Sequence, residues 1–218
     1  MSSHATGTRV QRMPRAQRRA QLLGAALTVF VSKGYHAAAM EDIADEAGVS
    51  KPVLYQHFPG KRDLFLALVQ FTLAELSEKL ERSLASAETN KARVQNVIDT
   101  HFKFVNSQPE AHRLVFSADL MSFPEVAAQL DEFYQGIAVA VAAVLGPKAG
   151  MPPAQATMLS RGLVHLVQTS AVFWTRHPEA GTREEVQDRI FRLAWGGIRT
   201  LDEERREPAP KLIGNDRG

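Results

Sequence analysis

Between residues 51 and 61 the sequence places a set of side chains that suit contact with DNA. They are Lys51, Pro52, Val53, Tyr55, Gln56, His57 and Lys61. Gln56 can offer a paired donor and acceptor to a base edge, and Pro52 and Val53 can press on thymine methyl groups. Lysine, tyrosine and histidine side chains can reach phosphates, which position a protein on the duplex without reading its sequence. The pattern predicts a DNA-contacting surface; the alternative interpretation is an ordinary helical hairpin with a solvated face.

Two short helices joined by a glycine turn would hold this surface in place. The spacing of apolar residues predicts helices over 40–47 and 51–58, with the turn at Gly48. Ser50 is a suitable N-cap residue, and a proline in the first helical turn, such as Pro52, costs no hydrogen bond. The apolar anchors of the two helices are Ile43, Ala44, Ala47, Leu54 and Phe58. This is the layout of a helix-turn-helix whose second helix enters the major groove.

The distribution of charge favours the same interpretation. Residues 1–62 carry nine Lys/Arg and four Asp/Glu, a balance of +5, whereas residues 63–218 carry a balance of −3. A basic N-terminal segment followed by a mildly acidic remainder of the chain indicates that the N-terminal segment binds a polyanion. A solvated, disordered basic tail is the alternative, and charge alone does not separate the two.

Patterns typical of enzymes are missing from the sequence. There are no cysteines, which excludes disulfides, cysteine zinc sites and thiol nucleophiles. The seven histidines form no HExxH pair, and no phosphate-cradling glycine loop or nucleophile elbow is present. We therefore expect no catalytic residues, no metal and no cofactor. A small helical enzyme is one alternative, and a lipid carrier without a DNA-binding role is another, although the lipid carrier would leave the Lys51–His57 surface without a purpose.

Helical periodicity runs through almost the whole chain, which predicts an all-α fold of about nine helices. A helix should start at Pro14 and stop at Gly34, and a long one should begin near Arg62. The later helices are expected over 91–107, 110–121, 124–145, 154–177 and 182–204, with Gly146-Pro147 among the breakers between them. The predicted divisions are a flexible basic arm (1–13), a helix-turn-helix DNA-binding domain (14–62), a larger C-terminal ligand-binding and dimerisation domain (63–203) and a disordered tail (204–218).

Aromatic and methionine residues are concentrated between positions 90 and 177, where they can line an apolar pocket for a small molecule. The predicted ligand contacts are Phe102, Phe116, Met121, Phe123, Phe133, His165, Thr169 and Phe173. Plain core packing is the alternative for the aromatic residues, because side chains at helical spacing are often core. For His165, the alternative is a polar strip at a subunit interface.

The last two helices carry an apolar face with small residues, including Gly162, Leu163, Gly197 and Ile198. A glycine inside a helix costs about 1 kcal/mol, so close packing is expected there. This face predicts a homodimer on a near-palindromic operator, with packing inside one subunit as the alternative. The longest apolar run, Ile137 to Leu145, is too short to span a bilayer, so we expect a cytoplasmic protein with no membrane partner.

The stretch around the turn resembles the TetR family of transcriptional regulators. The resemblance covers about residues 15–69 and consists of Ile43-Ala44, Ala47-Gly48-Val49-Ser50, Leu54-Tyr55-Gln56-His57-Phe58 and Lys61. It implies base-facing roles for Lys51, Pro52, Val53 and Gln56, and backbone-facing roles for Tyr55, His57 and Lys61. It also implies that the last two helices pair with their copies in a dimer. The sequence departs from the family at Ala38 and Ala39, where a serine or threonine often caps the first short helix.

A narrower resemblance concerns the actinobacterial TetR-type regulators of fatty-acid synthesis. It is carried by the segments GYHAAAMEDIADEAGVSKPVLYQHF, HRLVFSADLMSFPEVAAQL and LAWGG. Those regulators respond to long-chain acyl-CoA, so this resemblance implies an effector with an acyl chain and a large polar head.

Overall fold

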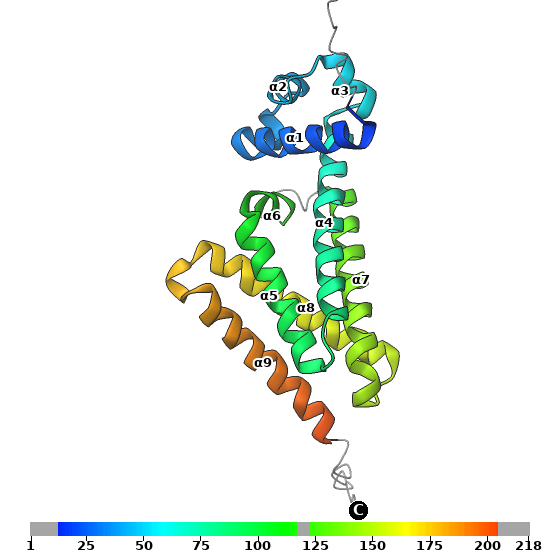
Figure 1. Cartoon of the computed structure of the whole chain (residues 1–218), viewed down its shortest axis with the longest axis vertical. Coiled ribbons are helices and arrows are strands. Elements are labelled where there is room, and N and C mark those ends of the chain that lie inside the picture. Colours follow the sequence, from blue (N-terminus) through cyan, green and yellow to red (C-terminus); the bar gives the residue numbers. More distant parts are fainter. Residues whose placement is uncertain (1–12, 117–122, 205–218) are drawn as a thin grey trace, which may run out of the picture. The chain divides into compact units, whose positions relative to one another are not determined.

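The computed structural model describes residues 13–116 and 123–204 of the chain. The regular structure in these ranges is entirely helical (Figure 1). The α-helices are α1 (Arg15–Ala37), α2 (Met40–Glu46), α3 (Lys51–His57), α4 (Lys61–Ala85), α5 (Asn90–Ser107), α6 (Pro109–Val115), α7 (Pro124–Ala149), α8 (Pro153–Arg176) and α9 (Arg183–Glu204), with a 3₁₀ turn at Pro178–Ala180. The all-α expectation and most helix bounds are confirmed to within one or two residues.

The expected break at Gly146-Pro147 is wrong, because α7 continues through Pro147 to Ala149. The proline has no N–H to donate to the carbonyl of Ala143 one turn earlier, so α7 continues at the cost of one hydrogen bond near its end. Gly150, with φ of 61°, then ends the helix in the left-handed conformation. Gly146 serves packing instead, since a Cβ there would lie 2.9 Å from the Cβ of Ala156 on α8. The helix expected over 110–121 is described only as α6, and residues 117–122 lie outside the described ranges.

The chain divides into two compact units, residues 1–68 and 69–218, so the division falls inside α4. In the first unit, α1 packs on α2 and α2 on α3. Regular helix is interrupted at Gly34, where φ is 77°, as the sequence predicts. The core of this unit is fully buried and apolar: Leu22, Ala26, Phe30, Ile43, Leu54, Phe58, Leu64 and Phe65.

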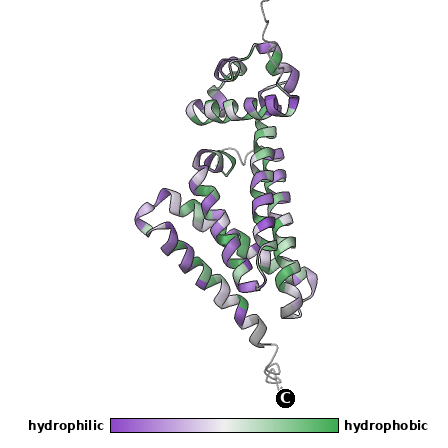
Figure 2. Ribbon diagram, in the orientation of Figure 1, coloured by the Kyte–Doolittle hydropathy of each residue, from purple (hydrophilic) through white to green (hydrophobic). Residues whose placement is uncertain are grey.

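In the second unit, α7 packs against α8, while α5 lies against both α8 and α9. Figure 2 shows green hydrophobic and purple hydrophilic residues alternating along these helices, as expected for helices with one buried face. One core cluster joins α5 and α8 through Ile98, Phe102, Val105, Val167 and Ala171. Within the described ranges, the model has no helix that is long and apolar enough to cross a membrane.

Candidate DNA interface and effector cavity

The turn before α3 is made by Gly48, whose φ of 64° suits glycine. Ser50 occupies the N-cap position but makes no side-chain cap hydrogen bond. Its carbonyl oxygen instead accepts from the N–H groups of Val53 (3.0 Å) and Leu54 (3.3 Å). Leu54 is fully buried and fixes the rotation of α3. The opposite side of α3 therefore presents Lys51, Pro52, Tyr55 and Gln56 as exposed side chains, with Val53 and His57 half-buried.

The start of α2 is stabilised by Asp42 in place of the missing serine or threonine. Its carboxylate accepts from the backbone N–H of Ala39 at 3.0 Å, which satisfies a backbone donor at the helix start. The same carboxylate pairs with Lys33 at 2.8 Å. The bond from Lys33 and the one from Ala39 hold the pKa of Asp42 below its ordinary value. Asp42 thus supplies one of the two bonds of a capping box, and the bond from a side chain at Ala39 to the first helical turn is not made.

Two lysines predicted to contact DNA are already engaged within the first unit. Lys51 pairs with Glu41 at 2.5 Å, and that carboxylate raises the pKa of Lys51. The Lys61 ammonium donates to the carbonyl oxygens of His36 (3.0 Å) and Ala38 (2.8 Å). Because an ammonium has three N–H donors, one remains for a phosphate. Lys61 therefore also holds the α1–α2 connection, a role that the sequence did not indicate.

Three arginines of α1 extend the basic surface, and the site prediction omitted them. Arg15, Arg18 and Arg19 lie close enough to His57 for their charges to lower its pKa, although burial is the larger cause. The Arg19 guanidinium also lies 4.5 Å from the centroid of the Phe58 ring. Their spacing at i, i+3 and i+4 places them on one helix face, and this signal could have identified them. The three arginines therefore add positive charge to the surface beside His57.

A cavity of about 50 Å³ lies in the second unit among α4, α5, α7, α8 and α9. Its walls are largely aliphatic and include Leu80, Leu84, Val97, Val141, Val164 and Ala194. Pockets for drug-sized ligands have volumes of about 300–1,000 Å³. A long-chain ligand therefore fits only if these helices move apart.

The aromatic residues predicted to contact the ligand lie elsewhere. Phe102 belongs to the α5–α8 core cluster, Phe133 is buried and Phe173 is exposed. His165 lies 4.3 Å from Tyr134 between ring centroids, and Thr169 is exposed. Phe116 borders a shallow groove between α6 and α8, Phe123 is half-buried, and Met121 lies outside the described residues. None of the described members of the predicted set lines the cavity. The cavity is therefore lined by aliphatic side chains, which are smaller than the aromatic rings that the sequence suggested.

Beside the cavity, the second unit buries a polar cluster that the sequence did not indicate. The amide Nε2 of Gln168 lies 3.3 Å from Nε2 of His112, and the His101 and His112 rings are 6.1 Å apart. Burial, aided by the charge of His112, lowers the pKa of His101 to about 3. Burial lowers the pKa of His112 to about 4. Both rings are therefore neutral at pH 7.

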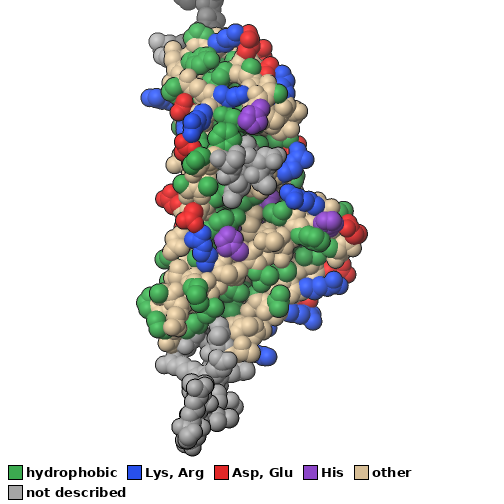
Figure 3. Space-filling view, turned by 180° about the vertical axis from the view of Figure 1, so that it is seen from behind, with side chains coloured by type: hydrophobic (Ala, Val, Ile, Leu, Met, Phe, Trp, Pro, Cys, Tyr) green, Lys and Arg blue, Asp and Glu red, His purple; other side chains and the backbone are tan. Residues whose placement is uncertain are grey.

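Helices α8 and α9 leave large apolar side chains exposed, and Figure 3 shows hydrophobic atoms gathered on the side of the second unit that α8 crosses. These exposed side chains are Met158, Leu159, Phe173 and Leu193. Of the residues named from the sequence as the dimer face, Gly162 and Gly197 are exposed, whereas Leu163 lines the cavity and Ile198 is buried.

Comparison with known proteins places this geometry among bacterial regulators. Residues 22–68 match the family model for bacterial regulatory proteins of the tetR family. The chain is 37% identical over 190 residues to the HTH-type transcriptional activator FasR of Mycolicibacterium smegmatis, covering 87% of each protein.

Two solved structures share the fold. A putative transcriptional regulator of Pseudomonas aeruginosa has a TM-score of 0.77 at 20% identity, covering 92% of this chain and 99% of that one. The transcriptional regulator FadR of Bacillus subtilis, in complex with stearoyl-CoA, has a TM-score of 0.67 at 19% identity, covering 80% and 96%.

Proposed function

This chain belongs to the TetR family of bacterial regulatory proteins and is a DNA-binding transcriptional regulator, and we propose that a long-chain acyl-CoA controls its affinity for its operator. The aliphatic cavity carries this proposal, since its walls match the chemistry of an acyl chain. The ligand class is supported by FadR of Bacillus subtilis, whose solved structure is a complex with stearoyl-CoA.

The proposed coupling runs through α4, because this helix contributes to both units. Leu64 and Leu68 of α4 belong to the core of the first unit, while Leu80 and Leu84 form part of the cavity wall. A ligand too large for the cavity has to displace its walls, and interiors packed at native density respond by moving whole elements. Displacing α4 at Leu80 and Leu84 then changes the position of the helix-turn-helix. A ligand shifts this equilibrium only by its differential affinity for the two states.

We further propose that α3 enters the major groove, with the seven predicted residues and the α1 arginines in distinct roles. Gln56, with Lys51, Pro52 and Val53, faces the bases. Tyr55, His57 and Lys61 contact the backbone together with Arg15, Arg18 and Arg19. Replacing Gln56 by Ala should cost about 1–3 kcal/mol at the preferred operator and relax base preference at one or two positions. Electrophoretic mobility shift against operators substituted one base pair at a time measures this.

The matched variant for the DNA test is Arg18→Gln. It should weaken binding to every sequence alike and reduce the slope of log K against log salt by about one. If Gln56→Ala keeps the base preference of the wild type, α3 does not read bases in the major groove, and this conclusion holds for any effect of Arg18→Gln on affinity.

The effector proposal is tested by titrating palmitoyl-CoA against the operator complex. We expect operator affinity to change by about 5- to 150-fold, and operator to change palmitoyl-CoA affinity by the same factor, because coupling is reciprocal. Acetyl-CoA is the matched control, since it carries the same head without the chain. Val97→Phe, which fills the cavity, should remove the response while leaving operator binding intact. Palmitoyl-CoA that binds without altering operator affinity would exclude it as the effector.

A further inference from the structure

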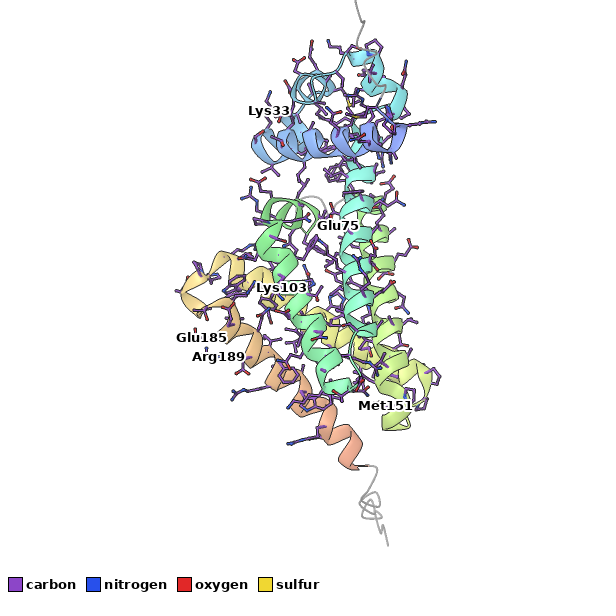
Figure 4. All side chains as sticks on the ribbon, in the orientation of Figure 1. Lys33, Glu75, Lys103, Met151, Glu185 and Arg189 are labelled. Atoms are coloured by element: carbon purple, nitrogen blue, oxygen red, sulfur yellow. The ribbon has the colours of Figure 1, made fainter. Side chains whose placement is uncertain are left out.

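The aliphatic cavity contains two polar groups, and both stand on α5. Arg93 and His101 line it on one face of that helix, about 12 Å apart along its axis. Between them the wall is formed by Val94, Val97 and Ile98. Figure 4 shows the side chains of α4 and α5 directed into the space between these helices.

The Arg93 guanidinium is held in position but lacks a counter-charge. Its Nη1 donates to Oδ1 of Asn90 at 3.2 Å. Asn90 is itself buried and donates through Nδ2 to the carbonyl oxygen of Val144 on α7, at 3.3 Å. Nε of Arg93 is buried with no hydrogen-bond partner. Among the described residues, no carboxylate pairs with Arg93, and Glu75 of α4, labelled in Figure 4, is engaged by Lys79 and Gln108.

His101 lies two turns further along α5, close to Gln168, whose Oε1 is also buried without a hydrogen-bond partner. The His101 side chain is 5% exposed, and its Nε2 is buried without a hydrogen-bond partner. Buried polar groups are nearly always paired, since an unpaired one costs about 1–3 kcal/mol. Gln168 and His101 can therefore pair with each other, whereas the unpaired Nε of Arg93 in an apolar cavity indicates a ligand that supplies its partner.

We propose that Arg93 is the anion-binding residue of this cavity and that it takes a carboxylate or phosphate group attached to a long apolar chain. The chain lies along Val94, Val97 and Ile98 in the direction of His101. Guanidinium groups suit this role because their donors match carboxylate and phosphate oxygens. This inference rests on the proposed acyl effector and specifies which of its groups the protein recognises.

The test measures binding of three probes to the full chain by calorimetry: palmitoyl-CoA, palmitate and the neutral hexadecanol. Wild type should bind at least one of the two anionic probes about tenfold or more tightly than hexadecanol. Arg93→Gln should weaken that binding by about ten- to 100-fold while changing hexadecanol affinity less than about twofold. Lys91→Gln removes a positive charge from an exposed position on the same helix, and it should change none of the three affinities.

The two anionic probes identify the source of the charge. If Arg93→Gln loses affinity for palmitoyl-CoA alone, Arg93 binds the CoA phosphates. If it loses affinity for palmitate, Arg93 binds the carboxylate. Arg93→Lys, which keeps the charge, should retain most of the binding and serves if the glutamine variant fails to fold. Equal affinity of wild type for hexadecanol and both anions, or an equal loss for all three probes in Arg93→Gln, would overturn the proposal. These binding measurements do not test whether the ligand changes operator affinity. The palmitoyl-CoA titration against the operator complex tests that effector function separately.

Discussion

Replacing Met158 and Leu193 together by glutamate is expected to make the protein monomeric and to reduce operator affinity by about 100-fold or more. Met158 on α8 is 65% exposed and Leu193 on α9 is 63% exposed. Large apolar side chains at these positions fit the proposed dimer contact through α8 and α9, where a carboxylate would be buried without a partner. Two linked recognition helices bind half-sites about 34–36 Å apart. Losing the link removes an avidity of about 10²–10⁴.

Light scattering gives the mass of the variant, and a mobility shift gives its operator affinity. Val139→Glu is the matched control, because Val139 is similarly exposed but lies on α7. It should remain dimeric and bind the operator like wild type. A double variant that stays dimeric at micromolar concentration would show that α8 and α9 do not form the contact.

Acidification is expected to unfold the second unit through His101 and His112. Their pKa values of about 3 and about 4 lie far below the ordinary 6.5 because burial disfavours the charged ring. The unfolded chain therefore binds more protons between pH 6.5 and these values, so stability falls as pH falls through that window. Each histidine contributes a slope of up to about 1.4 kcal/mol per pH unit. Over two pH units the loss from the pair is comparable to the total stability of about 5–15 kcal/mol.

Urea denaturation followed by circular dichroism between pH 7.5 and 4.5 measures this slope. The histidine contribution to the free energy of unfolding should be constant above about pH 7.5 and decrease below pH 6.5. His112→Gln should reduce the slope by about half, because one proton-linked group is removed. An unchanged slope in His112→Gln would exclude this cause of acid lability.

The sequence alone was sufficient to predict the helix-turn-helix. Gly48 adopts a positive φ, Pro52 lies in the first turn of α3, and Leu54 is the buried anchor, all as the pattern indicates. These features depend on residues a few positions apart, so the local pattern contains the necessary information. The exposed side of α3 follows directly once Leu54 is buried. The same holds for the helix ends of α5, α8 and α9, where capping and proline signals are local.

The cavity and the outer face of α8 and α9 were decided only by tertiary structure. The pattern marks Leu163 and Ile198 as apolar but does not tell whether such a residue meets the cavity, its own core or a second subunit. The aromatic residues were expected to line the cavity, whereas Phe102 and Phe133 are buried in the core, Phe173 is exposed, and the cavity is lined by smaller aliphatic side chains. In the sequence, Arg93 and His101 are ordinary polar positions of a helix, and only the packing of α4 and α7 against α5 places them at the cavity. Such assignments depend on which helices pack together and at what separation. The residues that meet in this way are far apart in the sequence, so the spacing of apolar residues within one helix does not predict their contacts.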